Sequence, residues 1–201
     1  MEEEILFIQD ISEEEKEMLQ TGIKNLKEIL EEEQGALTFG LYDPTRMYPF
    51  QFMAEGNYGI IFQYKHYVIK YIKEYSWEEE ELEHEASIYL KLQGINQIPT
   101  LYGYSYRFLI MEKLEGSIVQ EGFVPEDLEH FRQQIRESAE AILDKGYIPF
   151  DIEFFITREG KVKVLDMGLF QSYTDPSQKE RHLKSVCQLW DTYLGVKEKK
   201  E

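Results

Sequence analysis

Four short segments of this sequence carry residue types that could bind phosphate groups and a divalent cation. The first is Ala54-Glu55-Gly56-Asn57-Tyr58-Gly59, which lies between two strand-like runs. Glycines at 56 and 59 permit a sharp turn and a close backbone approach to a ligand, with amide N–H groups facing phosphate oxygens. A Gly-x-x-Gly segment between strands is, taken alone, more often a plain turn, so the other segments must support this reading.

The second and third segments supply one cation and one anion. Lys70 ends an apolar strand-like run, and Glu85 lies in a helical stretch close to the face that carries Ala86 and Tyr89. A carboxylate near an apolar face needs a cationic partner to offset its lost hydration. Lys70 is the nearest upstream candidate, so we expect the two side chains to pair, although a lysine at such a position is usually a surface residue.

The fourth segment holds two aspartates. Asp151 follows the stretch 146–150, and Asp166 ends an apolar strand-like run just before Met167-Gly168. An acidic residue at the end of an apolar strand, followed by a small-residue turn, is a usual place for a metal-binding carboxylate. Each aspartate taken singly is more typical of a helix cap or a turn.

The order of these segments resembles that of the protein kinase-like superfamily. Over roughly residues 48–173, a glycine turn, a strand lysine, a helix glutamate, a Met-Glu segment, a loop aspartate and a strand-end Asp-x-Gly follow one another. The family's Gly-x-Gly-x-x-Gly-x-Val pattern falls on 54–61, with Ala54 in place of the first glycine and Tyr58 at the tip. Asp166-Met167-Gly168 resembles the family's Asp-Phe-Gly.

The resemblance implies ATP and Mg²⁺ as cofactors and a role for each residue. Lys70, paired to Glu85, would hold the α- and β-phosphates, Asp166 would bind Mg²⁺, and Asp151 would orient the attacking hydroxyl or accept its proton. The nucleotide-binding residues that it implies are Gly56, Asn57, Tyr58, Gly59 and Lys70 near the phosphates, and Met111 (as gatekeeper), Glu112, Lys113 and Leu114 near adenine.

The catalytic-loop segment departs from the family pattern. Pro149-Phe150-Asp151 stands where the family has His-Arg-Asp. Counting forward from Asp151 places the family's metal-binding asparagine at Ile156, which has no ligating atom, whereas counting back from Asp166 along an expected hairpin places it at Glu153. Because strand pairing around Gly160 would fix the register of that hairpin, we favour Glu153 as the second metal ligand.

Two functions remain open at this point. One is a phosphotransferase acting on a Ser/Thr hydroxyl of a protein or on a small-molecule alcohol, similar to the compact atypical kinases of the RIO type and minimal bacterial-type kinases, since no activation segment follows Gly168. The other is a pseudokinase that binds nucleotide or serves as a scaffold, which the loss of the catalytic-loop histidine and arginine favours. We favour the enzyme, because the family's four charged catalytic positions are all occupied by charged residues here, namely Lys70, Glu85, Asp151 and Asp166.

The elements that must position these residues indicate an α+β protein. The patterns predict helices over 12–33, from 76, from 125 to about 146 and over 177–194, and strands over 48–53, 60–64, 67–72, 101–105, 108–113, 154–157 and 161–165. The resemblance implies a two-lobed kinase-like fold. It consists of an N-terminal helical extension (1–45), a small antiparallel-sheet N-lobe with the hinge (46–116) and a truncated, mainly helical C-lobe (117–201). The first helix could pack on the small lobe or recruit a partner.

Composition restricts the partners and the compartment. With 201 residues, 42% hydrophobic and 14% aromatic, the chain has the composition of a folded globular protein. Its net charge of −17 repels nucleic acid and anionic membranes, so we expect neither as a partner, only a nucleotide and a phosphate acceptor. The single cysteine, Cys187, excludes an internal disulfide and favours a cytoplasmic location, and its neighbours on the last helix predict a buried core thiol.

Overall fold

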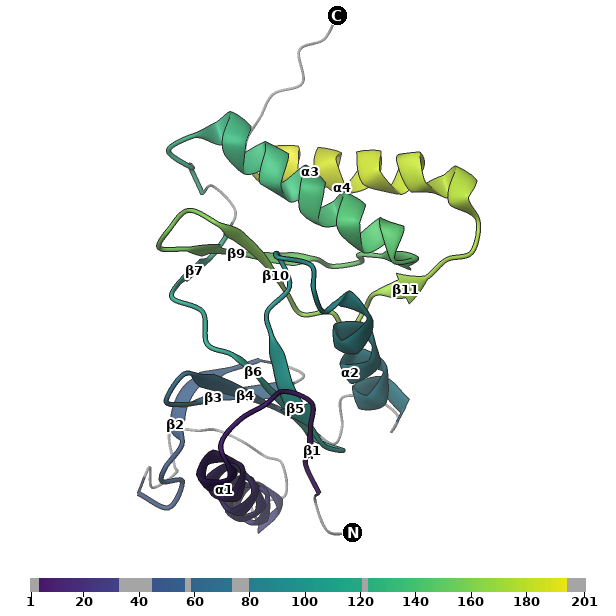
Figure 1. Ribbon diagram of the computed structural model, residues 1–201. Helices are drawn as coiled ribbons and strands as arrows, with labels where there is room; N and C mark the ends of the chain where they lie inside the picture. Colours follow the sequence, from purple (N-terminus) through teal and green to yellow (C-terminus); the bar gives the residue numbers. More distant parts are fainter. Residues whose placement is uncertain (1–3, 33–44, 57–58, 74–79, 121–122, 195–201) are drawn as a thin grey trace, which may run out of the picture. The chain divides into compact units, whose positions relative to one another are not determined.

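The computed structural model describes residues 4–32, 45–56, 59–73, 80–120 and 123–194, and it divides the chain into two compact units (Figure 1). Unit 1 consists of Met1–Ala86 and Thr100–Lys113, and unit 2 of Ser87–Pro99 and Leu114–Glu201. Both units contain helices and antiparallel strands, so the chain is an α+β protein, as the sequence predicts.

Unit 1 is built on a six-stranded antiparallel sheet with the strand order β1-β5-β6-β4-β3-β2. Its elements are β1 (Leu6–Phe7), α1 (Glu13–Glu32), β2 (Gln51–Glu55), β3 (Gly59–Tyr64), β4 (Tyr67–Ile72), β5 (Leu101–Tyr104), β6 (Phe108–Glu112) and the first part of α2 (Glu80–Leu92). Strands β3 and β4 alternate between inward and outward side chains, which is why their sequence periodicity located them well.

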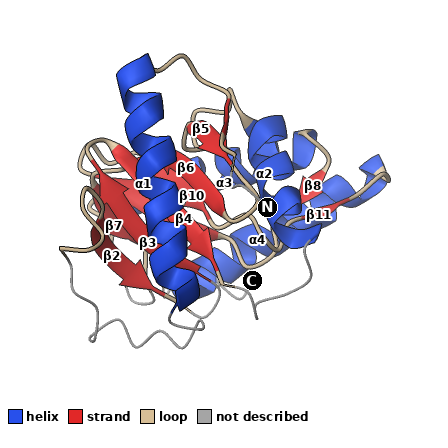
Figure 2. Cartoon of the chain, turned by 90° about the horizontal axis from the view of Figure 1, so that it is seen from below, coloured by secondary structure: helices blue, strands red, loops and turns tan. Residues whose placement is uncertain are grey.

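Helix α1 covers one face of this sheet (Figure 2). Its apolar residues recur every three to four positions, and four of them are almost fully buried, namely Leu19, Ile23, Leu26 and Leu30. They belong to the same core cluster as Ile60, Phe62 and Ile69 of the sheet. Of the two alternatives for the N-terminal helix, packing against the sheet is therefore what the structure shows.

Unit 2 combines two long helices with small sheets. Its elements are the end of α2, β7 (Gly116–Ile118), α3 (Leu128–Asp144), β8 (Tyr147–Ile148), β9 (Glu153–Thr157), β10 (Val162–Leu165), β11 (Gln171–Ser172), a 3-10 turn (Pro176–Gln178) and α4 (Lys179–Tyr193). Strands β10, β9 and β7 form one sheet in that order, and β11 pairs with β8. Helices α3 and α4 lie side by side (Figure 1), joined by the Arg132–Asp191 ion pair at 2.6 Å.

One predicted boundary is corrected by a local hydrogen bond, and not every observed strand was predicted. Helix α3 begins at Leu128 and not at Pro125, because the Asp127 carboxylate accepts the His130 amide at 3.0 Å and caps the helix there. Strand β7 was not predicted, since its three exposed residues show no alternation and form a strand only by pairing with β9. The predicted start of the second helix at residues 76–79 lies outside the described residues.

No helix within the described part of the chain is long and apolar enough to cross a membrane.

Candidate functional site

Lys70 and Glu85 form a largely buried ion pair inside unit 1. Lys70 lies on β4, with Ile61 of β3 and Leu109 of β6 as its neighbours across the sheet. Its ammonium nitrogen is 2.9 Å from Oε1 and 3.1 Å from Oε2 of Glu85 on α2. The side chains are only 14% and 4% exposed, so the carboxylate has lost most of its water and depends on this cation.

The glycine turn between β2 and β3 ends beside the same lysine. The Gly56 amide donates to the Gly59 carbonyl oxygen at 2.9 Å, which closes the turn. A Cβ at Gly59 would lie 2.7 Å from the Tyr71 carbonyl oxygen and 3.8 Å from Cε of Lys70, so only glycine fits here. At Gly56, by contrast, a Cβ would meet no atom within 4 Å. The predicted nucleotide-binding residues Asn57 and Tyr58 lie outside the described residues.

A second buried lysine, which the sequence did not single out, holds the other end of the turn. Lys73, just after β4, donates to Oε1 of Glu55 at 2.6 Å and to the Gly56 carbonyl oxygen at 2.8 Å. Lys73 is 7% exposed. Nothing in its sequence context separates it from a solvated lysine at a strand end, because only the fold brings Glu55 against it.

The segment expected near adenine is firmly bonded into the sheet. Met111 is 8% exposed and lies on β6, between β4 and β5. The amide of Glu112 donates to the Thr100 carbonyl oxygen at 2.8 Å, and that of Lys113 donates to the His66 carbonyl oxygen at 2.9 Å. The amides of Glu112 and Lys113 are therefore occupied by backbone acceptors of unit 1 and are not available as donors to adenine.

The three predicted carboxylates belong to unit 2 and gather around one end of the β9–β10 hairpin. Glu153 is the first residue of β9, and its Cα partner is Leu165, the residue before Asp166. Ile156 lies inside β9, paired with Val162 on one side and Ser117 on the other. The hairpin register therefore places Glu153, and not Ile156, opposite the residue that precedes Asp166.

The two aspartates share an unusual backbone conformation. Asp151 has φ 49° and Asp166 has φ 51°, in the left-handed region, and both residues are exposed. This conformation is unfavourable for a residue with a Cβ, although aspartate tolerates it better than most. Such residues persist where the surrounding structure enforces them, and they are concentrated at functional sites. Asp151 and Asp166 flank the hairpin, one before β9 and one after β10.

The donor set of unit 2 fits Mg²⁺ better than a transition metal. No group of three or more His, Cys, Asp or Glu side chains among the described residues is placed to hold a metal ion alone. Mg²⁺ is usually bound by one or two carboxylates, with waters and substrate phosphates completing its coordination. Glu153 and Asp166 offer hard oxygen ligands of this kind, so they fit a cation that arrives with a nucleotide.

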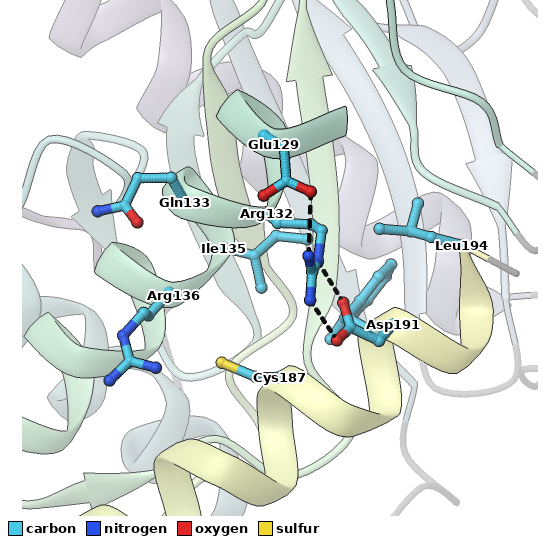
Figure 3. A pocket seen from close by; sticks show the side chains of 9 residues that line it. Glu129, Arg132, Gln133, Ile135, Arg136, Cys187, Asp191 and Leu194 are labelled. Carbon is cyan, nitrogen blue, oxygen red and sulfur yellow. Dashed lines mark hydrogen bonds and ion pairs between the residues drawn. The ribbon is translucent and has the colours of Figure 1, made fainter. Parts of the chain in front are cut away.

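A separate pocket of about 200 Å³ lies between α3 and α4 (Figure 3). Arg132 spans part of it, with Nε and Nη2 donating to the two carboxylate oxygens of Asp191 at 2.6 and 2.7 Å. Cys187 also lines the pocket and is only half-buried, so the prediction of a core thiol is corrected: its helix face turns partly toward this hollow. Burial still raises the pKa of the Cys187 thiol, which disfavours the nucleophilic thiolate.

Known protein families and curated proteins provide no match to this chain. The geometry of the two units therefore carries the functional argument. Within unit 1 the structure brings together Lys70, Glu85 and Gly59. Within unit 2 it pairs Glu153 with Leu165, the residue before Asp166, and Asp151 lies two residues before β9.

Proposed function

We propose that the chain is an ATP- and Mg²⁺-dependent phosphotransferase, a compact atypical member of the protein kinase-like superfamily. Unit 1 would be its small antiparallel-sheet lobe and unit 2 its reduced C-lobe. The acceptor would be a Ser/Thr hydroxyl of a protein or a small-molecule alcohol, and the compartment would be the cytoplasm.

The Lys70–Glu85 pair is the observation that carries this proposal. Burying two charges costs several kcal/mol per ion in hydration, so apolar residues could fill the same space at equal or greater stability. Function explains the pair better: the carboxylate holds the ammonium on the middle of the sheet, next to Gly59. A polyphosphate meeting the turn would find there a fixed positive charge in a chain whose net charge is −17.

The remaining residues supply what phosphoryl transfer needs besides a lysine. Asp166 and Glu153 would hold Mg²⁺, and the bound ion would neutralise charge on the phosphate oxygens. Asp151 would orient the attacking hydroxyl and accept its proton. Lys70 would hold the α- and β-phosphates, and no covalent intermediate on the protein is required.

One feature favours a second candidate, a pseudokinase that binds nucleotide without transferring phosphate. The residue before Asp151 is Phe150, which is 43% exposed and has no polar side-chain atom to organise the loop. The residue before that is Pro149, which lacks a backbone N–H as well. A loop held only by its backbone could retain nucleotide binding and lose the alignment that transfer requires.

The two candidates are separated by measuring transfer and binding on the same variants. We expect Mg²⁺-dependent release or transfer of the γ-phosphate of labelled ATP, reduced at least ~100-fold in Asp166→Asn and in Lys70→Met. Lys65→Met, which removes a 49% exposed lysine from the far end of the β3–β4 hairpin, is the matched control and should retain activity.

Because Lys70→Met leaves Glu85 buried without its partner, the double variant Lys70→Met/Glu85→Gln is tested beside it, with circular dichroism to verify folding. MgATP that raises the melting temperature without any turnover would select the pseudokinase. No shift in melting temperature at millimolar MgATP, together with no turnover, would overturn both candidates.

A further inference from the structure

We propose that Lys73 is a positioning residue: together with Glu55 it clamps the first half of the glycine turn and so sets the affinity for nucleotide phosphates. This inference rests on the phosphotransferase proposed above, but it concerns a residue outside the lysine–glutamate pair and the metal carboxylates. It assigns the two buried lysines of unit 1 to different tasks.

The contacts of Lys73 are directed at the turn and at the strand that leads into it. Its ammonium donates to the carboxylate of Glu55, the last residue of β2, and to the backbone carbonyl oxygen of Gly56, the first residue of the turn. Both distances, 2.6 and 2.8 Å, are those of charge-assisted hydrogen bonds. The turn joins β2 to β3, and β4 follows β3. Lys73, just after β4, therefore links the end of β4 to the end of β2.

Burial makes this arrangement specific. Lys73 is 7% exposed as a residue, and the Glu55 side chain is 19% exposed. An ammonium removed from water must keep its hydrogen-bond acceptors, so the turn cannot shift away from Lys73 without a cost in free energy. A solvated lysine would exert no such restraint, because water would replace the lost contacts.

The two lysines lie at the two ends of the turn, and Lys73 is hydrogen-bonded to it. The Lys70 side chain runs beside Gly59, where an added Cβ would lie 3.8 Å from its Cε, while Lys73 binds the oxygen of Gly56. Glycine at 56 gives the backbone wide freedom, and the contact with Lys73 removes part of that freedom in advance of binding. The Lys73 ammonium also occupies the Gly56 carbonyl oxygen, which would repel a phosphate group that it faced.

The direct test is the affinity for MgATP of the full chain, by titration calorimetry, and its steady-state kinetics. Lys73→Met should raise the Kd and the KM for ATP about tenfold, while kcat at saturating ATP changes less than about twofold, the pattern of lost ground-state binding. Lys73→Arg, which keeps the charge and the donors, should restore most of the affinity. Lys65→Met, at the opposite end of the same hairpin, should have no effect.

A second measurement needs no nucleotide. The Gly56 amide, which donates to the Gly59 carbonyl oxygen, should exchange its hydrogen at least about tenfold faster in Lys73→Met than in the wild type or in Lys65→Met. If Lys73→Met is poorly folded, Lys73→Met/Glu55→Gln removes both charges and replaces it in each assay.

The outcomes separate the clamp from the proposed function. Unchanged Gly56 exchange in Lys73→Met would overturn the clamp, whatever the activity. Faster exchange with unchanged ATP affinity would overturn its role in binding. A wild-type chain that binds no MgATP would overturn the proposed function and this role in affinity with it, while the exchange result would still decide the clamp.

Discussion

The two units hold their charged residues in opposite ways. In unit 1, Lys70 and Glu85 are buried and fixed by each other through hydrogen bonds of 2.9 and 3.1 Å. In unit 2, Asp151 and Asp166 are exposed, and both adopt a left-handed backbone, one before and one after a hairpin. The charge is thus largely buried in one unit and exposed to solvent in the other.

This difference predicts how stability and function are linked in each unit. Replacing either residue of the Lys70–Glu85 pair removes two hydrogen bonds from a largely buried charge, so in unit 1 a loss of function should come with a loss of stability. Asp151 is exposed on a left-handed backbone, so its replacement in unit 2 should remove function without loss of stability. The following variants test that contrast, beginning with the largest expected effect.

Glu85→Gln should lower the free energy of unfolding by about 3 kcal/mol, because the 14% exposed Lys70 side chain would lose its carboxylate. Urea denaturation measures the loss. Glu115→Gln is the control, since Glu115 pairs with Arg158 where the side chains are 56% and 78% exposed, and its effect should be close to zero. An equal, small effect for both variants would contradict the contrast between buried and exposed charges.

Gly59→Ala should lower the free energy of unfolding by about 2 kcal/mol, since the new Cβ would overlap the Tyr71 carbonyl oxygen at 2.7 Å and the backbone would have to shift. Gly56→Ala, where a Cβ meets nothing within 4 Å, should change it by less than about 0.5 kcal/mol. Thermal melting of the two variants measures the difference. A turn that tolerates alanine equally at both positions would show that its second half is not closely packed.

The two units also offer a pair of tyrosines for comparison. The Tyr173 hydroxyl donates to the Leu143 carbonyl oxygen at 2.7 Å, so Tyr173→Phe should cost about 1 kcal/mol. The Tyr67 hydroxyl is buried, and among the described residues it has no hydrogen-bond partner, so Tyr67→Phe should leave stability unchanged or raise it. Chemical denaturation at neutral pH measures the free energy of unfolding of both variants. A larger loss in Tyr67→Phe than in Tyr173→Phe would show that the Tyr67 hydroxyl forms a hydrogen bond in solution.

Tyr67 gives the same comparison a pH dependence. Burial, with a smaller contribution from Glu15, raises the pKa of Tyr67 to about 12 from 10.0. The folded state holds the Tyr67 proton more tightly than the unfolded chain does. The contribution of this protonated hydroxyl to the free energy of unfolding is therefore present below pH 10 and is lost as the pH rises toward 12. Tyr67→Phe should remove this part of the alkaline loss of stability.

Asp151→Gly should give the smallest change in stability, a gain of about 0.5 kcal/mol, because glycine adopts the left-handed backbone at φ 49° without strain. The same variant should lose phosphate transfer if Asp151 orients the acceptor. Melting temperature and transfer rate are measured on one preparation. A marked loss of stability in Asp151→Gly would show that function and stability are linked in unit 2 as they are in unit 1, which would contradict the contrast between the units.

Sequence patterns located the elements whose periodicity reflects burial. Strand β4 matches its predicted range, Tyr67–Ile72, and α1 begins one residue after its predicted start, while its predicted end at 33 lies outside the described residues. Both elements present a regular apolar face to one core. Strand β7 could not be found, since its three residues are exposed and depend on pairing with β9, distant in sequence. The left-handed backbone at Asp151 likewise has no sequence signal.

The candidate site was only partly predictable for a similar reason. The approach of Glu85 to Lys70 followed from the need of a buried carboxylate for a cation. The role of Lys73 has no sequence signal, because its partners, Glu55 and the carbonyl oxygen of Gly56, become its neighbours only once β2, β3 and β4 are paired. The hydrogen bonds that occupy the amides of Glu112 and Lys113 depend likewise on strand pairing, that of β6 with β5 and β4, and not on local sequence.

The affinity of Lys70→Met/Glu85→Gln for MgATP, measured by calorimetry beside the wild type and Lys65→Met, tests the central claim most directly. If Lys70 provides the positive charge that receives nucleotide phosphates, the double variant should fold and bind MgATP at least about tenfold more weakly, while Lys65→Met binds like the wild type. A folded double variant with wild-type affinity would contradict the account.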